Sequence, residues 1–101
     1  MDYGLSLEAM DAIVETLTKF NNIQKAVIYG SRAKGNYKPG SDIDIALYAD
    51  SLKLNEVNKI SMDLDDLMLP YIFDLSVYHK IKNKDLKDHI DRVGKLIFKR
   101  N

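Results

Sequence analysis

Hydrophobic residues recur along the chain with two spacings, one typical of helices and the other of strands. Segments in which they recur about every 3.6 residues predict amphipathic helices. Short runs rich in β-branched and aromatic residues predict strands. The predicted order is helix, strand, strand, helix, strand, helix, over the segments 7–20, 25–30, 42–48, 54–68, 71–78 and 86–97.

Three positions are expected to mark the ends or bends of helices. Ser6 can cap the first helix, and the second helix should stop before Pro70. The last helix is expected to be interrupted or bent near Gly94. Its hydrophobic positions are Leu86, Ile90, Val93 and Ile97. The consecutive apolar residues 96–98 are expected to pack in the core, with partner docking as the alternative.

The connections between the strands predict the fold class. A helix joins strands 42–48 and 71–78, so these strands should run parallel with a right-handed crossover. A loop joins strands 25–30 and 42–48, so this pair should be antiparallel. We therefore expect an α/β (α+β) fold, a small mixed sheet with helices on one face, in which residues 1–101 form one domain.

Composition excludes several classes of protein. The chain has no cysteine, so disulfides, thiolate metal sites and cysteine nucleophiles are unavailable. Its 15 basic and 15 acidic residues balance, which argues against a dedicated nucleic-acid binder. Residues 80–101 carry eight Lys or Arg against three Asp, a bias typical of a solvated helix face. Without a secretory leader or an apolar run of roughly 20 residues, a cytoplasmic protein with no membrane contact is expected.

Three aspartates carry the candidate chemistry. Asp42 and Asp44 are two residues apart in a strand and so point to the same face, opposite Ile43 and Ile45. Asp74 should lie on the same face of the neighbouring strand. Carboxylates grouped in this way repel one another unless a hard cation lies between them, and oxygen ligands suit Mg²⁺ or Mn²⁺. A strand-capping Asp42 and a merely exposed Asp74 are the alternative.

The loop before the aspartates has the composition of a phosphate-binding loop. Gly30 permits close approach of a ligand to the backbone, and Ser31 can open a helical turn whose amides face an anion. Arg32 and Lys34 add positive charge. Gly30 and Gly35 have P-loop spacing, but the Lys and Ser/Thr of that motif are missing.

Other polar residues are expected to have no role in a site. Asp63, Asp65 and Asp66 fall on the second predicted helix, where residues two apart point in different directions. His79 and His89 have no second histidine or cysteine at zinc-site spacing. We therefore expect all five to be surface residues.

The chain has "GS" at 30–31, then ten residues, then "DID" at 42–44, and a third acid at Asp74. This pattern resembles the signature of the nucleotidyltransferase superfamily with the DNA polymerase β palm fold. The small size is similar to the minimal nucleotidyltransferases of prokaryotes. The resemblance covers nearly the whole chain and implies that the three aspartates, catalytic and metal-binding, hold two Mg²⁺ ions. It also implies that ATP phosphates bind at Gly30, Ser31, Arg32, Lys34 and Ser41.

The same resemblance implies a partner. Minimal nucleotidyltransferases are similar to the antitoxins of pairs with HEPN-domain ribonucleases, in which AMP from ATP is placed on a tyrosine of a toxin encoded nearby. We expect no second domain within these 101 residues to hold an acceptor, which fits a hetero-oligomer. Two alternatives stay open: a non-catalytic module that inhibits its partner by occlusion, and a homodimeric transferase for a small molecule.

Overall fold

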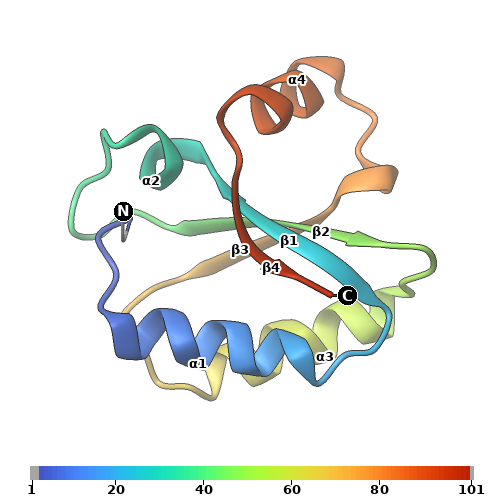
Figure 1. Ribbon diagram of the computed structural model, residues 1–101, viewed down its shortest axis with the longest axis horizontal. Helices are drawn as coiled ribbons and strands as arrows, with labels where there is room; N and C mark the ends of the chain where they lie inside the picture. Colours follow the sequence, from blue (N-terminus) through green and yellow to red (C-terminus); the bar gives the residue numbers. More distant parts are fainter. Residues whose placement is uncertain (1–2, 101) are drawn as a thin grey trace.

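The computed structural model describes residues 3–100, in which helices and strands alternate around one sheet (Figure 1). The six predicted elements appear in the predicted order, with a short helix added in the glycine-serine loop and a strand added after the last helix. The elements are α1 (Leu7–Thr18), β1 (Ile23–Tyr29), α2 (Gly30–Lys34), β2 (Ile43–Ala49), α3 (Leu54–Asp65), β3 (Phe73–Val77), the 3₁₀ turn η1 (Tyr78–Lys80), α4 (Lys84–Val93) and β4 (Lys95–Lys99).

The sheet has the mixed topology that the connections predict. Its strand order is β3-β2-β1-β4, in which β2 and β3 are parallel and β1 is antiparallel to both β2 and β4. The fold is therefore the mixed α/β arrangement that the sequence predicts. Within residues 3–100, no helix has the length and apolar character needed to cross a membrane.

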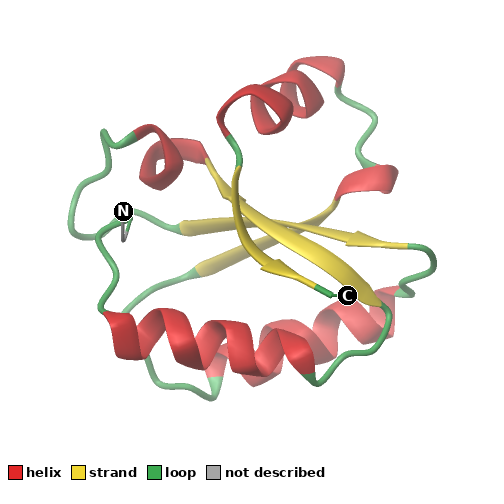
Figure 2. Ribbon diagram, viewed as in Figure 1, coloured by secondary structure: helices red, strands yellow, loops and turns green. Residues whose placement is uncertain are grey.

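One face of the sheet carries the main core. Helices α1 and α3 lie side by side beneath it (Figure 2). The predicted cap of α1 is present, since Ser6 Oγ accepts a hydrogen bond of 3.1 Å from the Ala9 amide. Alternate residues of β2 point to these helices and are almost fully buried, namely Ile43, Ile45 and Leu47. Residues between them, including Asp44, consequently face the other side of the sheet.

The C-terminal segment differs from its prediction. The last helix ends at Val93, and residues 95–99 form β4, an edge strand paired with β1. Ile97 and Phe98 therefore pack on the core from a strand, and Leu96 is 55% exposed. The predicted interruption at Gly94 is present, but the prediction that the helix continues to residue 97 was wrong, because the chain changes from helix to strand at Gly94.

Helix α4 lies on the face of the sheet opposite α1 and α3 (Figures 1 and 2). Ile90 is its buried contact and packs against Val27, Tyr29 and Ala46 in a second, smaller core. The expectation of helices on a single face holds for the two long helices and not for α4. This position matters because α4 covers the sheet face that carries Asp44.

Candidate functional site

The carboxylates of β2 and β3 lie beside one another at the start of the two strands. The parallel register pairs Asp44 directly with Asp74, and Ile43 with Phe73. Asp42 immediately precedes β2 and is exposed, as is Asp74, whereas Asp44 is half-buried. The strand alternation thus brings Asp44 and Asp74 onto one face, with Asp42 at its edge.

The surroundings of Asp44 disfavour the charged form of its carboxyl group. Burial first, and then the neighbouring charges of Asp74 and Asp42, raises the pKa of the Asp44 carboxyl to about 6. The ion pairs in the described part of the chain, Lys59–Asp63 and Arg92–Asp88, involve none of the three. A negative charge on Asp44 therefore lacks a compensating side chain.

Gly30 lies directly against the Asp44 carboxylate. Its φ of +74° lies in the left-handed region, and a Cβ at this position would overlap Asp44 Oδ2. Only glycine meets both conditions without strain. The end of β1 and the start of β2 are therefore close enough for the Gly30–Ser31 turn and the carboxylates to contact one ligand.

Tyr29 and Ser76 continue the same face behind the carboxylates. The Tyr29 hydroxyl lies 3.1 Å from Ser76 Oγ. Burial is the main cause that raises the Tyr29 pKa, the Ser76 hydrogen bond lowers it, and the charges of Asp74 and Asp44 raise it further. Tyr29 is thus a neutral, buried side chain that packs beneath the acidic edge.

The aspartates fit a hard divalent cation by chemistry more than by present geometry. All donors are carboxylate oxygens. Burial is the largest cause of the raised pKa of Asp44, and repulsion by Asp74 and Asp42, which a cation would relieve, adds to it. Within residues 3–100, no group of three or more Asp, Glu, His or Cys side chains is arranged to hold a metal ion. Because Asp42 and Asp74 are exposed, their side chains are free to change rotamer and close on an ion.

Arg32 has a different place from the one predicted. It is only 1% exposed, and its guanidinium donates to the Ser41 carbonyl through Nε and Nη2 and to the Tyr3 carbonyl through Nη1. The rings of Tyr37 and Tyr71 flank it. Arg32 therefore ties the glycine-serine loop to the N-terminal segment, and its donors are not available to a phosphate.

The other predicted loop residues are placed less uniformly. Ser31 is half-buried in the first turn of α2, next to Gly30. Lys34 is exposed in the last turn of α2, at the far end from Gly30. Ser41 Oγ accepts from the Lys38 amide at 2.8 Å, and its carbonyl holds Arg32, so Ser41 shapes the loop.

His89 is the residue at this site that the sequence did not reveal. The prediction of a surface histidine was wrong, because Nε2 of His89 on α4 accepts a 3.1 Å hydrogen bond from the Gly30 amide. Its ring also meets Tyr29 edge-on at 6.0 Å between centroids. A lone histidine with no partner at fixed spacing carries no sequence signal for such a contact. His79, by contrast, is exposed as predicted.

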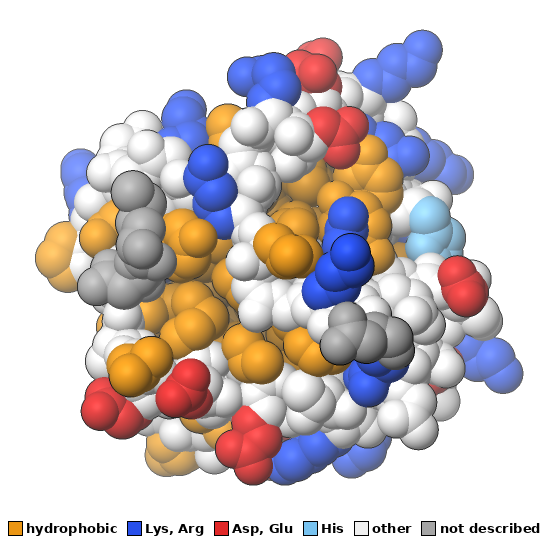
Figure 3. Space-filling view, viewed as in Figure 1, with side chains coloured by type: hydrophobic (Ala, Val, Ile, Leu, Met, Phe, Trp, Pro, Cys, Tyr) orange, Lys and Arg blue, Asp and Glu red, His pale blue; other side chains and the backbone are white. Residues whose placement is uncertain are grey.

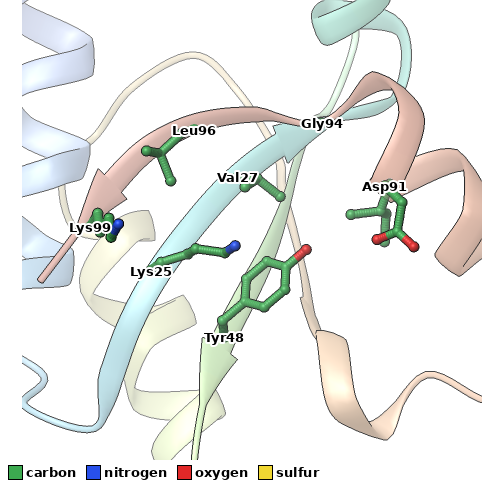
Figure 4. Close-up of a pocket in the computed structure, with 8 residues that line it drawn as sticks. Lys25, Val27, Tyr48, Asp91, Gly94, Leu96 and Lys99 are labelled. Carbon is green, nitrogen blue, oxygen red and sulfur yellow. The ribbon is translucent and has the colours of Figure 1, made fainter.

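A separate cavity of about 370 Å³ lies on the same sheet face, between α4 and β4 (Figure 4). Lys25 and Tyr48 rise from β1 and β2 into it, and Asp91 faces them from α4 (Figure 4). The Lys25 Nζ lies 4.4 Å from the centre of the Tyr48 ring. Lys99 on β4 stands directly opposite Lys25 in the register.

Comparisons with known proteins agree with this architecture. The sequence profile of the family described as "Polymerase beta, Nucleotidyltransferase" matches residues 11–101. No curated protein sequence matches the chain.

Several solved structures that are similar to this chain come from toxin–antitoxin complexes. One, with AMP-PNP, has a TM-score of 0.76 and 21% identity, over 91% of this chain and 74% of that chain. A second contains tri-AMPylated Shewanella oneidensis HEPN toxin with MNT antitoxin, with a TM-score of 0.71 and 19% identity, over 92% and 71%. The MntA–HepT complex has a TM-score of 0.71 and 18% identity, over 94% and 74%. At such identities the likeness establishes the fold.

Proposed function

Because the chain belongs to the polymerase beta nucleotidyltransferase family, we propose that it transfers AMP from ATP to a hydroxyl group, a tyrosine of a HEPN-domain ribonuclease toxin, and acts as the antitoxin. One observation carries the proposal. Asp44 and Asp74 stand side by side in the register, Asp44 lies directly against Gly30, and Asp44 has no countercharge among the described residues.

The site residues have different proposed roles in the reaction. Gly30 and Ser31 lie where the backbone can approach the nucleotide phosphates, since Gly30 has no side chain to block them. Asp42, Asp44 and Asp74 would hold divalent metal ions, two Mg²⁺ by the family pattern. Bound there, such ions supply charge stabilisation for phosphoryl transfer.

The transfer exchanges one bond for another. The acceptor tyrosine oxygen forms a bond to the α-phosphorus, the bond from that phosphorus to the bridging oxygen breaks, and pyrophosphate leaves. The hydroxyl proton passes to Asp74, the exposed carboxylate beside Asp44. Tyr29 and Ser76, hydrogen-bonded to each other behind the acids, keep this edge of the sheet rigid.

The contents of the similar structures support the proposed partner. One of them pairs an MNT antitoxin with an AMPylated HEPN toxin, and another contains AMP-PNP. These facts concern those proteins and support the proposal for this chain by similarity of fold. An acceptor on a separate protein also fits the exposed position of Asp74 at the sheet edge.

The test is transfer of label from [α-³²P]ATP with Mg²⁺ to the purified product of the neighbouring reading frame. We expect labelled tyrosine with the wild-type chain and none with the Asp42→Asn/Asp44→Asn double variant. Asp74→Asn alone should slow transfer by about 10²-fold or more if it accepts the proton. Asp63→Asn on α3 is the matched control.

Two results would replace the proposal. If the double variant silences the neighbour without any label, the chain acts by occlusion. If the wild-type chain labels an aminoglycoside without any protein partner, the acceptor is a small molecule.

A further inference from the structure

We infer that His89 is a positioning residue that holds the Gly30–Ser31 turn in the conformation a nucleotide requires and so makes nucleotide binding depend on helix α4. The inference deepens the proposed function and rests on it. It starts from a contact between residues 59 apart in the sequence, the hydrogen bond from the Gly30 amide to His89 Nε2.

Gly30 is held from two sides by different kinds of contact. On one side the Asp44 carboxylate lies so close that no Cβ fits, a contact that is repulsive for any other residue. On the other side His89 accepts the Gly30 N–H at 3.1 Å. The backbone at Gly30 has a φ of +74°, a conformation that needs such restraint because glycine has many alternatives. His89 supplies the attractive half of that restraint.

The hydrogen-bond direction defines what His89 does. An Nε2 that accepts an N–H carries no proton, so the neutral ring keeps its proton on Nδ1. In this state Nε2 has no donor for a phosphate oxygen. His89 therefore acts through the Gly30 backbone and, through it, orients the following amide of Ser31.

The packing of α4 links the hydrogen bond between Gly30 and His89 to the rest of the fold. Ile90, the next residue, is buried against Val27 and Ala46 on the sheet. Tyr29, immediately before Gly30, packs edge-on against the His89 ring. The placement of the turn is thus coupled to the packing of α4, and a shift of α4 would move the turn relative to Asp44.

The experiment measures AMP-PNP affinity by calorimetry with Mg²⁺ in the whole chain. His89→Phe keeps a ring against Tyr29 but has no acceptor, and should weaken binding about three- to tenfold, the value of one hydrogen bond. His89→Gln can place Oε1 near the position of Nε2 and should restore most of the loss. His79→Phe, on the other histidine, should bind as the wild type does.

A second measurement reads the contact without any nucleotide. Long-range ¹H–¹⁵N spectra should show His89 Nε2 unprotonated and Nδ1 protonated, and the Gly30 amide should exchange faster in His89→Phe. A protonated Nε2 in the neutral ring, or equal AMP-PNP affinity for wild type and His89→Phe, overturns the inference.

If the wild type binds AMP-PNP but labels no acceptor, the proposed function fails while the role of His89 at the turn is still decided. If the wild type binds no AMP-PNP, the link to nucleotide falls with it.

Discussion

The sheet contains two pairs of like charges, and the two members of each pair lie opposite each other on neighbouring strands. Asp44 stands beside Asp74 on the parallel strands β2 and β3, and Lys25 stands opposite Lys99 on the antiparallel strands β1 and β4. Helix α4 covers this face of the sheet (Figure 1), where its His89 contacts Gly30 next to Asp44, and the lysine pair lines the cavity beside it (Figure 4). By charge pattern alone, either pair suggests a site for a ligand of opposite sign.

The two pairs differ in burial and in how freely their side chains can move apart. The Asp44 carboxyl is half-buried against Gly30 and cannot escape its neighbours, which is why its pKa rises to about 6. Lys99 is exposed, and Lys25 extends its ammonium over the Tyr48 ring. Long flexible side chains reach solvent or an aromatic face, whereas a short carboxylate fixed in a strand does not. A like-charge pair therefore indicates a ligand only where burial prevents the charges from separating.

Lys and Arg side chains are spread over the molecular surface in keeping with this reading (Figure 3). In that view they border exposed hydrophobic side chains on several sides and form no single compact patch (Figure 3). Most of the basic residues after position 80 are exposed, as expected for a solvated surface. The acidic edge remains the place where charge is concentrated and confined.

The largest expected effect comes from filling the space between the turn and the carboxylate. Gly30→Ala places a methyl group on Asp44 and forces a side chain into a left-handed conformation. We expect a loss of about 2 kcal/mol or more in the free energy of unfolding, measured by urea denaturation, together with loss of AMP transfer.

Two other glycines separate the causes of that loss. Gly35 has a φ of +89° but nothing within 4 Å of a Cβ, so Gly35→Ala should show the backbone strain alone, about 1 kcal/mol. Gly40 has no such φ and open space around it, and Gly40→Ala should change stability by less than about 0.5 kcal/mol. Equal losses for Gly30→Ala and Gly35→Ala would show that Asp44 does not press on the turn.

The acidic edge was largely predictable because it depends on strand periodicity. Alternation along β2 buries Ile43 and Ile45 and turns Asp44 to the other face, and the crossover through α3 sets β3 beside it in parallel. The pairing of Asp44 with Asp74 follows from those two rules. Neither rule requires knowledge of contacts distant in the sequence.

The parts that were not predictable depend on distant contacts. His89 meets Gly30 only because β4 returns to pair with β1 and leaves α4 on the sheet. Arg32 is buried because carbonyls of Tyr3 and Ser41 converge on it, and no local pattern announces that. On either side of Gly94, the apolar residues Val93 and Ile97 also fit a helical period, so the sequence pattern did not reveal strand β4.

A smaller effect concerns the pH dependence of the metal-free protein. The folded state raises the Asp44 pKa above the ordinary value of 3.8, to about 6, so ionisation of Asp44 costs the folded state free energy. Stability that Asp44 contributes below pH 4 is therefore lost as the pH rises toward and through about 6. Urea unfolding in EDTA at several pH values should show this loss in the wild type, and Asp44→Asn should lessen it.

Magnesium sharpens the same measurement. Added Mg²⁺ should recover stability at pH 7.5 in the wild type and much less in Asp44→Asn, because the cation relieves the repulsion only where the carboxylate is present. Asp63→Asn, which removes a charge from α3, should behave as the wild type does. Stability of Asp44→Asn that falls with pH as steeply as that of the wild type would contradict the assigned repulsion.

The smallest expected effect tests the lysine pair, where charges are free to separate. Lys99→Glu places an acid opposite Lys25 in the register and should raise the free energy of unfolding by about 0.2–1 kcal/mol. Lys95→Glu makes the same change of charge on the same strand but opposite Ile28, and should give no comparable gain. Because the pair lies in the cavity between α4 and β4, away from Gly30 and Asp44, AMP-PNP affinity should be unchanged in both variants. A gain of several kcal/mol for Lys99→Glu would mean that the lysines repel as strongly as the aspartates do, and burial would then not be what distinguishes the two pairs.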